Sequence, residues 1–107
     1  MFTKHEEQGY RELLPGVWLR TMAHGERTLL GEFKIGKGAV IPEHSHPNEQ
    51  TGYLVSGRLE FVIEGEQQIA EAGDSWCLNG DTPHAATALE DSIVVEVFSP
   101  VREDYLP

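Results

Sequence analysis

The 107-residue chain has little of several features that define other classes of protein. Its single cysteine, Cys77, excludes an intramolecular disulfide, and a reducing cytoplasm is the expected location. No stretch approaches the roughly 20 apolar residues that a transmembrane helix needs. Residues 1–10 are polar and charged and contain no apolar run, so we expect neither a secretory signal nor a membrane anchor there.

Basic residues are scarce as well. Eight Lys and Arg stand against 18 Asp and Glu, which gives a formal net charge of −10. This balance argues against nucleic acid as a partner, because phosphate binding needs clustered Lys and Arg. The same charge opposes the approach of an anionic substrate. Capture of an anion would therefore need a local cation, either a metal ion or a buried arginine.

Helical patterns are also missing. No segment of ten or more residues carries an apolar stripe of helical period, and short runs rich in Val, Ile, Leu, Phe and Thr recur between turn signals. This pattern predicts a single all-β domain over residues 1–107, a sandwich or a barrel. The strands are expected over residues 17–22, 28–35, 39–43, 51–56, 58–63, 67–70, 75–78, 84–88 and 92–98.

Only the two ends of the chain are expected to be irregular, namely residues 1–10 and the tail after residue 100. Small β-barrels often tie down such ends by pairing them with a neighbouring subunit. A homodimer is therefore the expected assembly.

Two histidines two residues apart, His44 and His46, lie beside prolines in a stretch with no helical pattern. In an extended chain, residues i and i+2 point to the same face, so both imidazoles can reach one point, as a divalent metal ion requires. Gln50 follows as a further polar group, and Glu49 is its rival because it carries charge. Neighbours on a strand face opposite ways, so only one of these two should point inward.

A second segment supplies a third histidine. His84 follows a proline in a turn and precedes the expected strand 84–88. With this residue the chain resembles the cupin family, whose two motifs fall here on residues 38–57 and 73–88. The first motif is matched by Gly38, His44, His46, Gln50 and Gly57, with glutamine where glutamate is usual. In the second motif Gly73 and His84 fit, while Asn79, Asp81 and Ala88 replace a proline, a glycine and an asparagine.

The resemblance implies an RmlC-like jelly roll, a double-stranded β-helix barrel, with one divalent metal ion on His44, His46, Gln50 and His84. The motif spacing favours Gln50 over Glu49 as the fourth ligand. Three neutral imidazoles and a neutral amide leave the charge of the ion undiluted, which favours Lewis-acid chemistry over a site for Fe(III). The ligand types do not choose among Zn, Ni, Fe, Mn and Co.

The last expected strand, 92–98, is apolar except for Glu96, which shares one face with Val94 and Phe98. A carboxylate between apolar neighbours is costly unless it has a cation or a function. Two interpretations stay open. Glu96 pairs with Arg102 or lies on an exposed edge, or it faces a cavity as a general acid/base whose pKa is raised by burial.

Other candidate residues are set aside. His5 and His24 have no comparable setting and are interpreted as surface residues. Cys77 lies in a Trp-Cys-Leu strand, where we expect a buried and inert thiol rather than a catalytic one.

A closer resemblance covers most of the chain. Residues 44–50, 52–57 and 97–106 are similar to the pectin-degradation cupins, which open the ring of 4,5-unsaturated monouronates from pectin and alginate to the linear ketone. This resemblance implies an acid/base role for Glu96, where that family has aspartate. It also implies that Phe98 lines the pocket and that Arg102 is positioned for the substrate. Tyr53 is expected either in the same apolar wall or in plain core.

The sequence therefore predicts a metal-dependent cupin that acts on a small sugar acid by non-redox isomerase or lyase chemistry. The alternatives are a metal-dependent dioxygenase and a non-catalytic cupin that binds a carbohydrate or another small molecule.

Overall fold

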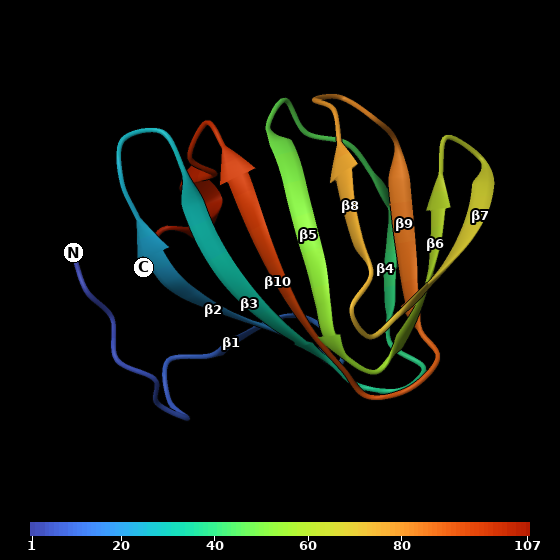
Figure 1. The fold of residues 1–107 in the computed structure, drawn as a ribbon, viewed down its shortest axis with the longest axis horizontal. Helices are drawn as coiled ribbons and strands as arrows, with labels where there is room; N and C mark the ends of the chain where they lie inside the picture. Colours follow the sequence, from blue (N-terminus) through green and yellow to red (C-terminus); the bar gives the residue numbers. More distant parts are fainter.

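The computed structural model describes all 107 residues, as ten strands and one short 3-10 helix (Figure 1). No helix has the length and apolar character needed to cross a bilayer. The all-β prediction is confirmed. The elements are β1 (Arg11–Leu14), β2 (Val17–His24), β3 (Leu29–Ile35), β4 (Val40–His44), β5 (Glu49–Ser56), β6 (Arg58–Ile63), β7 (Glu66–Glu71), β8 (Ser75–Leu78), β9 (His84–Ala88), β10 (Ser92–Ser99) and η1 (Glu103–Tyr105).

The strands form two antiparallel sheets. The larger has the order β1-β2-β3-β10-β5-β8 and the smaller the order β4-β9-β6-β7. Both sheets contribute to one apolar core, which includes Phe33 and Phe98 from the larger sheet and Leu59 and Phe61 from the smaller. The last strand, β10, lies between β3 and β5, in the interior of the larger sheet. Its inward side chains therefore point into the middle of the molecule.

Alternation along the strands agrees with the sequence pattern. In β3, Leu29, Phe33 and Ile35 are buried. In β10 the inward positions are those of Val94, Glu96 and Phe98. Each of the nine expected strands is present, with ends shifted by no more than two residues. Strand β1 and helix η1 were not expected. Strand β1 directly follows residues 1–10, and η1 lies in the tail after residue 100, and both of these segments were predicted to be irregular.

The thiol of Cys77 corrects one prediction, because it is exposed. Strand β8 is an edge strand of the larger sheet, and Leu78 is its buried residue. Alternation then turns Cys77 to the outer face, which no other sheet covers. The apolar neighbours of the thiol in sequence did not reveal which side of the strand it occupies.

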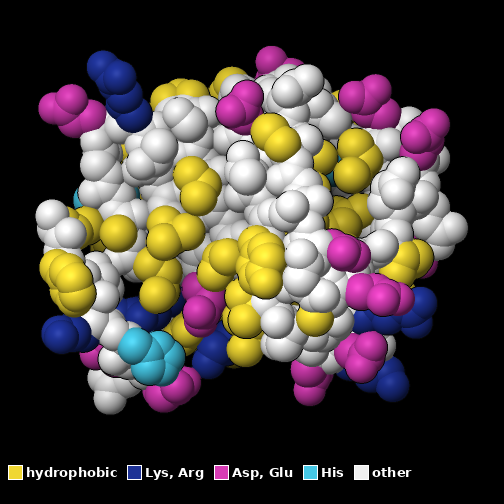
Figure 2. All heavy atoms as spheres, viewed as in Figure 1, with side chains coloured by type: hydrophobic (Ala, Val, Ile, Leu, Met, Phe, Trp, Pro, Cys, Tyr) yellow, Lys and Arg dark blue, Asp and Glu magenta, His cyan; other side chains and the backbone are white.

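The outer surface combines an apolar middle with acidic side chains that lie mostly toward the edges of the view (Figure 2). Large apolar residues exposed on β3, β5 and β10 are Leu30, Tyr53, Val55 and Val97. On β2, next to the edge strand β1, the guanidinium of Arg20 donates to the carbonyl oxygen of Lys4 over 3.1 Å. The residues before β1 are thus held against β2. The homodimer stays a prediction.

Candidate metal centre

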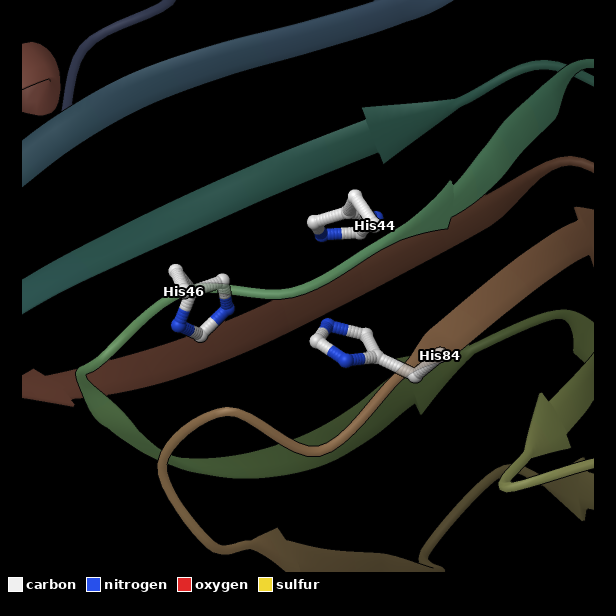
Figure 3. A group of neighbouring side chains, drawn as sticks. All are labelled: His44, His46 and His84. Carbon is white, nitrogen blue, oxygen red and sulfur yellow. The ribbon is translucent and has the colours of Figure 1, made fainter.

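Three histidines from two segments of the chain lie close together (Figure 3). His44 ends β4, His84 begins β9, and these two are directly paired in the smaller sheet. His46 lies in the connection between β4 and β5. One ring nitrogen of each histidine lies within 4.8 Å of those of the other two. His44 and His46 meet as predicted, but a loop brings them together, since the strand ends at His44.

Each imidazole is oriented by a backbone carbonyl two residues away. The Nδ1 atoms lie 2.7–3.0 Å from these oxygens, His44 facing Pro42, His46 facing Asn48 and His84 facing Thr82. A carbonyl can only accept, so Nδ1 carries the proton and Nε2 presents a lone pair. Burial lowers the pKa of His46 and of His84, which favours their neutral forms. Three imidazole nitrogens therefore face one region, and burial favours the neutral form of two of them.

The buried acceptors in this region fit a divalent metal ion. Nε2 of His84 is buried and has no hydrogen-bond partner. Nε2 of His46 lies 2.9 Å from Oε1 of Gln50, so two acceptors face each other. Unpaired buried acceptors are costly, and a cation between them removes that cost. Imidazole nitrogens with one amide oxygen form a donor set for a divalent transition metal, and these are the four residues that the sequence predicted.

Gln50, not Glu49, faces the histidines. Gln50 is only 7% exposed, whereas Glu49 is exposed on the opposite face of β5. Neighbouring residues on a strand face opposite ways, so only one of the two was expected to point inward, and that residue is Gln50.

The loops that carry His46 and His84 contact each other directly. The amide of Asp81 donates to the carbonyl oxygen of His46 over 2.7 Å. At Gly80 a Cβ atom would collide with the carbonyl oxygen of Pro47, so the close approach requires glycine. The Asn79-Gly80 turn therefore fixes the third histidine relative to the first two.

Glu96 points into the same interior from β10 and is 5% exposed. Its Oε1 accepts a hydrogen bond from Nε1 of Trp76 over 3.3 Å, and its Oε2 has no partner. Burial raises the pKa of Glu96 to about 8, although Gln50 and Trp76 act in the opposite direction. Glu96 is neither on an edge strand nor paired with Arg102, whose Nε lies 3.2 Å from Asp104. The cavity-facing interpretation is the one that the structure supports.

The two neighbours of Glu96 across the sheet are both glycines. Gly31 on β3 and Gly52 on β5 are in register with it. A Cβ atom at Gly52 would collide with Trp76 and would lie 2.5 Å from Oε2 of Glu96. Sequence reasoning missed Trp76 and Gly52, which together form the pocket of this carboxyl group.

Two adjacent hollows lie beside the histidines. An inner cavity of about 50 Å³ is lined by Glu96 and Gln50, and an outer groove of about 330 Å³ lies between β1, β4 and the C-terminal segment. The inner cavity has the size of a water site, whereas the groove falls within the range of small-ligand pockets. The residues that line both are Phe33, Ile41, His44, Arg102 and Tyr105. A ligand in the groove can thus direct one end toward Glu96.

Arg102 lies at the junction of cavity and groove. Its guanidinium carbon is 4.1 Å from the ring centroid of Tyr105 and 5.4 Å from that of Phe98. Phe98 lines the inner cavity, as expected. Phe98, Arg102, Glu96 and the proposed metal ligands are therefore brought to one place.

Tyr53 is the exception among the predicted site residues. It is 46% exposed and lies on the outer face of β5, between the inward-facing residues Gly52 and Leu54. The prediction that Tyr53 lines the pocket or belongs to the core was wrong. The tyrosine that lines the cavity is Tyr105 on η1. Tyr105 was not predicted as a site residue, because the tail after residue 100 was expected to be irregular.

Comparisons with known proteins agree with this architecture. The profile of the Cupin domain family matches residues 31–99. The chain is 30% identical over 103 residues to the pectin degradation protein KdgF of Dickeya dadantii (strain 3937), with 94% of each chain covered. It superposes on the structure of KdgF from Halomonas sp. with a TM-score of 0.93 and 35% identity, which covers 99% of this chain and 98% of that one.

A further relative has a different description. The chain is 34% identical over 85 residues to the quercetin 2,3-dioxygenase of Bacillus subtilis (strain 168). The match covers 73% of this chain and 25% of that protein.

Proposed function

The chain belongs to the cupin family, and on that premise we propose that it is a metal-dependent enzyme that opens the ring of a small unsaturated uronate. One observation carries the proposal: a single site holds an unpaired imidazole nitrogen on His84 and an unpaired carboxyl oxygen on Glu96. The first suits a metal ion and the second suits transfer of a proton. The similarity to two proteins named KdgF, one of them described as a pectin degradation protein, supports the substrate class.

The metal ion would be held by His44, His46, His84 and Gln50. When bound, it would supply a Lewis acid that polarises an oxygen of the substrate. All four ligands are neutral, so the ligands themselves leave the charge of the ion undiminished. One divalent transition metal, among Zn, Ni, Fe, Mn and Co, is proposed for the site.

Arg102 would bind the carboxylate of the substrate. Its Nε donates to Asp104, and its terminal nitrogens make no hydrogen bond within the protein. Those nitrogens can form a paired interaction with a carboxylate. In a chain of net charge −10, a cation at the junction of cavity and groove supplies the local attraction that an anionic ligand needs. Phe98 would form an apolar wall beside it.

Glu96 would move one proton between two positions of the substrate. As a base it removes the proton of the anomeric hydroxyl, and the bond between the anomeric carbon and the ring oxygen breaks as the aldehyde forms. The electron pair left on the ring oxygen forms the ketone, and the adjacent double bond takes up the proton at its far carbon. The reaction is an isomerisation, so no oxidant or reductant is needed.

The proposal is tested with metal-loaded protein and an unsaturated monouronate under anaerobic conditions, with the loss of enol absorbance as the signal. We expect acceleration over the spontaneous rate and a decrease of about 100-fold or more in Glu96→Ala, since general acid–base groups contribute roughly 10²–10⁴-fold. If the wild type opened the ring no faster than the spontaneous rate, a carbohydrate-binding role would replace the enzymatic one. An equally fast Glu96→Ala would instead remove Glu96 from the mechanism.

A second candidate function is a metal-dependent dioxygenase, which the match to the quercetin dioxygenase favours. Oxygen uptake separates the two, because ring opening consumes no oxygen. Turnover by the Fe(II)-loaded protein that stops without oxygen would favour the dioxygenase.

A further inference from the structure

Tyr105 lines both the inner cavity and the outer groove. Its ring packs edge-to-face against Phe33, with 5.9 Å between centroids, and against Phe98, with 5.4 Å. The guanidinium of Arg102 lies over the same ring. The position of the ring is thus set by three contacts in the wall of the proposed site.

The backbone around Tyr105 is held equally firmly. The hydroxyl of Thr21 on β2 donates to the carbonyl oxygen of Tyr105. The guanidinium of Arg11 on β1 donates to the carbonyl oxygen of Asp104 over 2.6 Å. Both bonds connect the 3-10 turn to the start of the larger sheet, so the tyrosine belongs to a fixed wall.

The ring and the backbone of Tyr105 contact the rest of the protein, but its phenol oxygen has no hydrogen-bond partner there. It makes no hydrogen bond to the protein, in contrast to the hydroxyl of Tyr10, which donates to Glu32. Burial raises the pKa of Tyr105, which keeps the phenol protonated at neutral pH and available as a donor. A phenol donor without a protein partner, on a residue that lines the cavity and the groove, is free to donate to a ligand there.

We propose that the Tyr105 hydroxyl donates a hydrogen bond to the substrate, at the oxygen next to the carboxylate that Arg102 binds. This inference rests on the proposed function and deepens it. Because the guanidinium of Arg102 lies over the Tyr105 ring, a carboxylate bound by Arg102 would lie beside that ring. In an unsaturated uronate the carbon beside the carboxylate bears the ring oxygen, where negative charge develops as the ring opens. Tyr105 would stabilise that charge without transferring a proton.

Two matched variants test the proposal in metal-loaded protein. Tyr105→Phe removes one oxygen and keeps the ring on which Arg102 lies. Tyr53→Phe removes the same atom from the exposed outer face. We expect Tyr105→Phe to lower kcat for an unsaturated monouronate about 10- to 100-fold, with a smaller change in KM, since one such donor typically contributes on that scale or above. Tyr53→Phe should stay within twofold of the wild type, and both variants should unfold at the wild-type temperature.

Two results would overturn the proposal. The first is a kcat of Tyr105→Phe within twofold of the wild type while Glu96→Gln is strongly impaired, which would leave the proposed function intact. The second result applies if the wild type does not accelerate ring opening. Binding of a saturated hexuronate, measured by calorimetry, then tests the contact in its place. Binding that is weakened at least fivefold by Tyr105→Phe supports the contact without the reaction. Equal binding, or none by the wild type, contradicts it.

Discussion

The side-chain amide of Asn48 donates a hydrogen bond to the carbonyl oxygen of Pro100 over 2.6 Å, and the carbonyl oxygen of Asn48 lies 3.0 Å from Nδ1 of His46. One buried residue therefore orients a proposed metal ligand with its backbone and holds the C-terminal segment with its side chain. Arg102 and Tyr105 follow Pro100 in that segment. The metal side and the substrate side of the site are connected through Asn48.

Replacement of Asn48 by alanine should loosen the C-terminal segment and leave the histidines in place, because the backbone carbonyl that orients His46 remains. We expect KM for an unsaturated uronate to rise severalfold and metal affinity to change by no more than about twofold. The free energy of unfolding should fall by about 1–3 kcal/mol, since a carbonyl loses its partner. Steady-state kinetics and metal titration check this, and Gln68→Ala on the exposed strand β7 is the control. An equal loss of metal and substrate affinity would disprove the division of roles.

Metal binding should depend on His84. We expect one divalent ion per chain, and metal at 100 times its dissociation constant should stabilise the fold by about 2.7 kcal/mol. His84→Ala should abolish the rise in unfolding temperature on addition of metal, and a chelator should reverse that rise in the wild type. His5→Ala, on the exposed N-terminal segment, should behave as the wild type. A metal-dependent rise that persists in His84→Ala would place the ion elsewhere.

Gly52 should tolerate no side chain. Alanine at this position would place a Cβ against Trp76 and Glu96, so we expect a loss of about 1–3 kcal/mol or more, typical of overpacking, together with loss of activity. Gly25→Ala is the matched control, because no atom lies within 4 Å of a Cβ there and its φ is not in the left-handed region. Denaturant unfolding of both variants is the measurement. Equal stability of the two would mean that the space around Glu96 is larger than the structure indicates.

The buried carboxyl of Glu96 should make the metal-free protein less stable as pH rises. Its pKa is raised by burial from 4.5 to about 8, so between these values the folded state keeps a proton that the unfolded state loses. Over this range the free energy of unfolding should fall by up to about 1.4 kcal/mol per pH unit from this group. Glu96→Gln removes the contribution, so the difference between variant and wild type should grow from pH 5 to pH 8. A constant difference would show that the carboxyl group titrates normally.

Much of this architecture was accessible from the sequence because it depends on local pattern. Alternation placed Glu96 and Phe98 on one face, and motif spacing identified His44, His46 and His84. Strand alternation would also have predicted the orientation of Tyr53. If Gln50 faces inward, Gly52 and Leu54 face inward as well, and Tyr53 faces outward. Trp76, Asn48 and Tyr105 could not be assigned in this way. Their positions depend on contacts between segments 20 or more residues apart.

The most direct test of the account is the rate of ring opening of an unsaturated monouronate by the wild type and by Glu96→Gln at equal metal occupancy, measured as loss of enol absorbance. Glu49→Gln, on the outer face of β5, is the control for removal of a carboxylate. We expect the wild type and Glu49→Gln to react alike, and Glu96→Gln to be slower by a factor of about 100 or more. A Glu96→Gln variant that opens the ring as fast as the wild type would contradict the assignment of Glu96 as the residue that moves the proton.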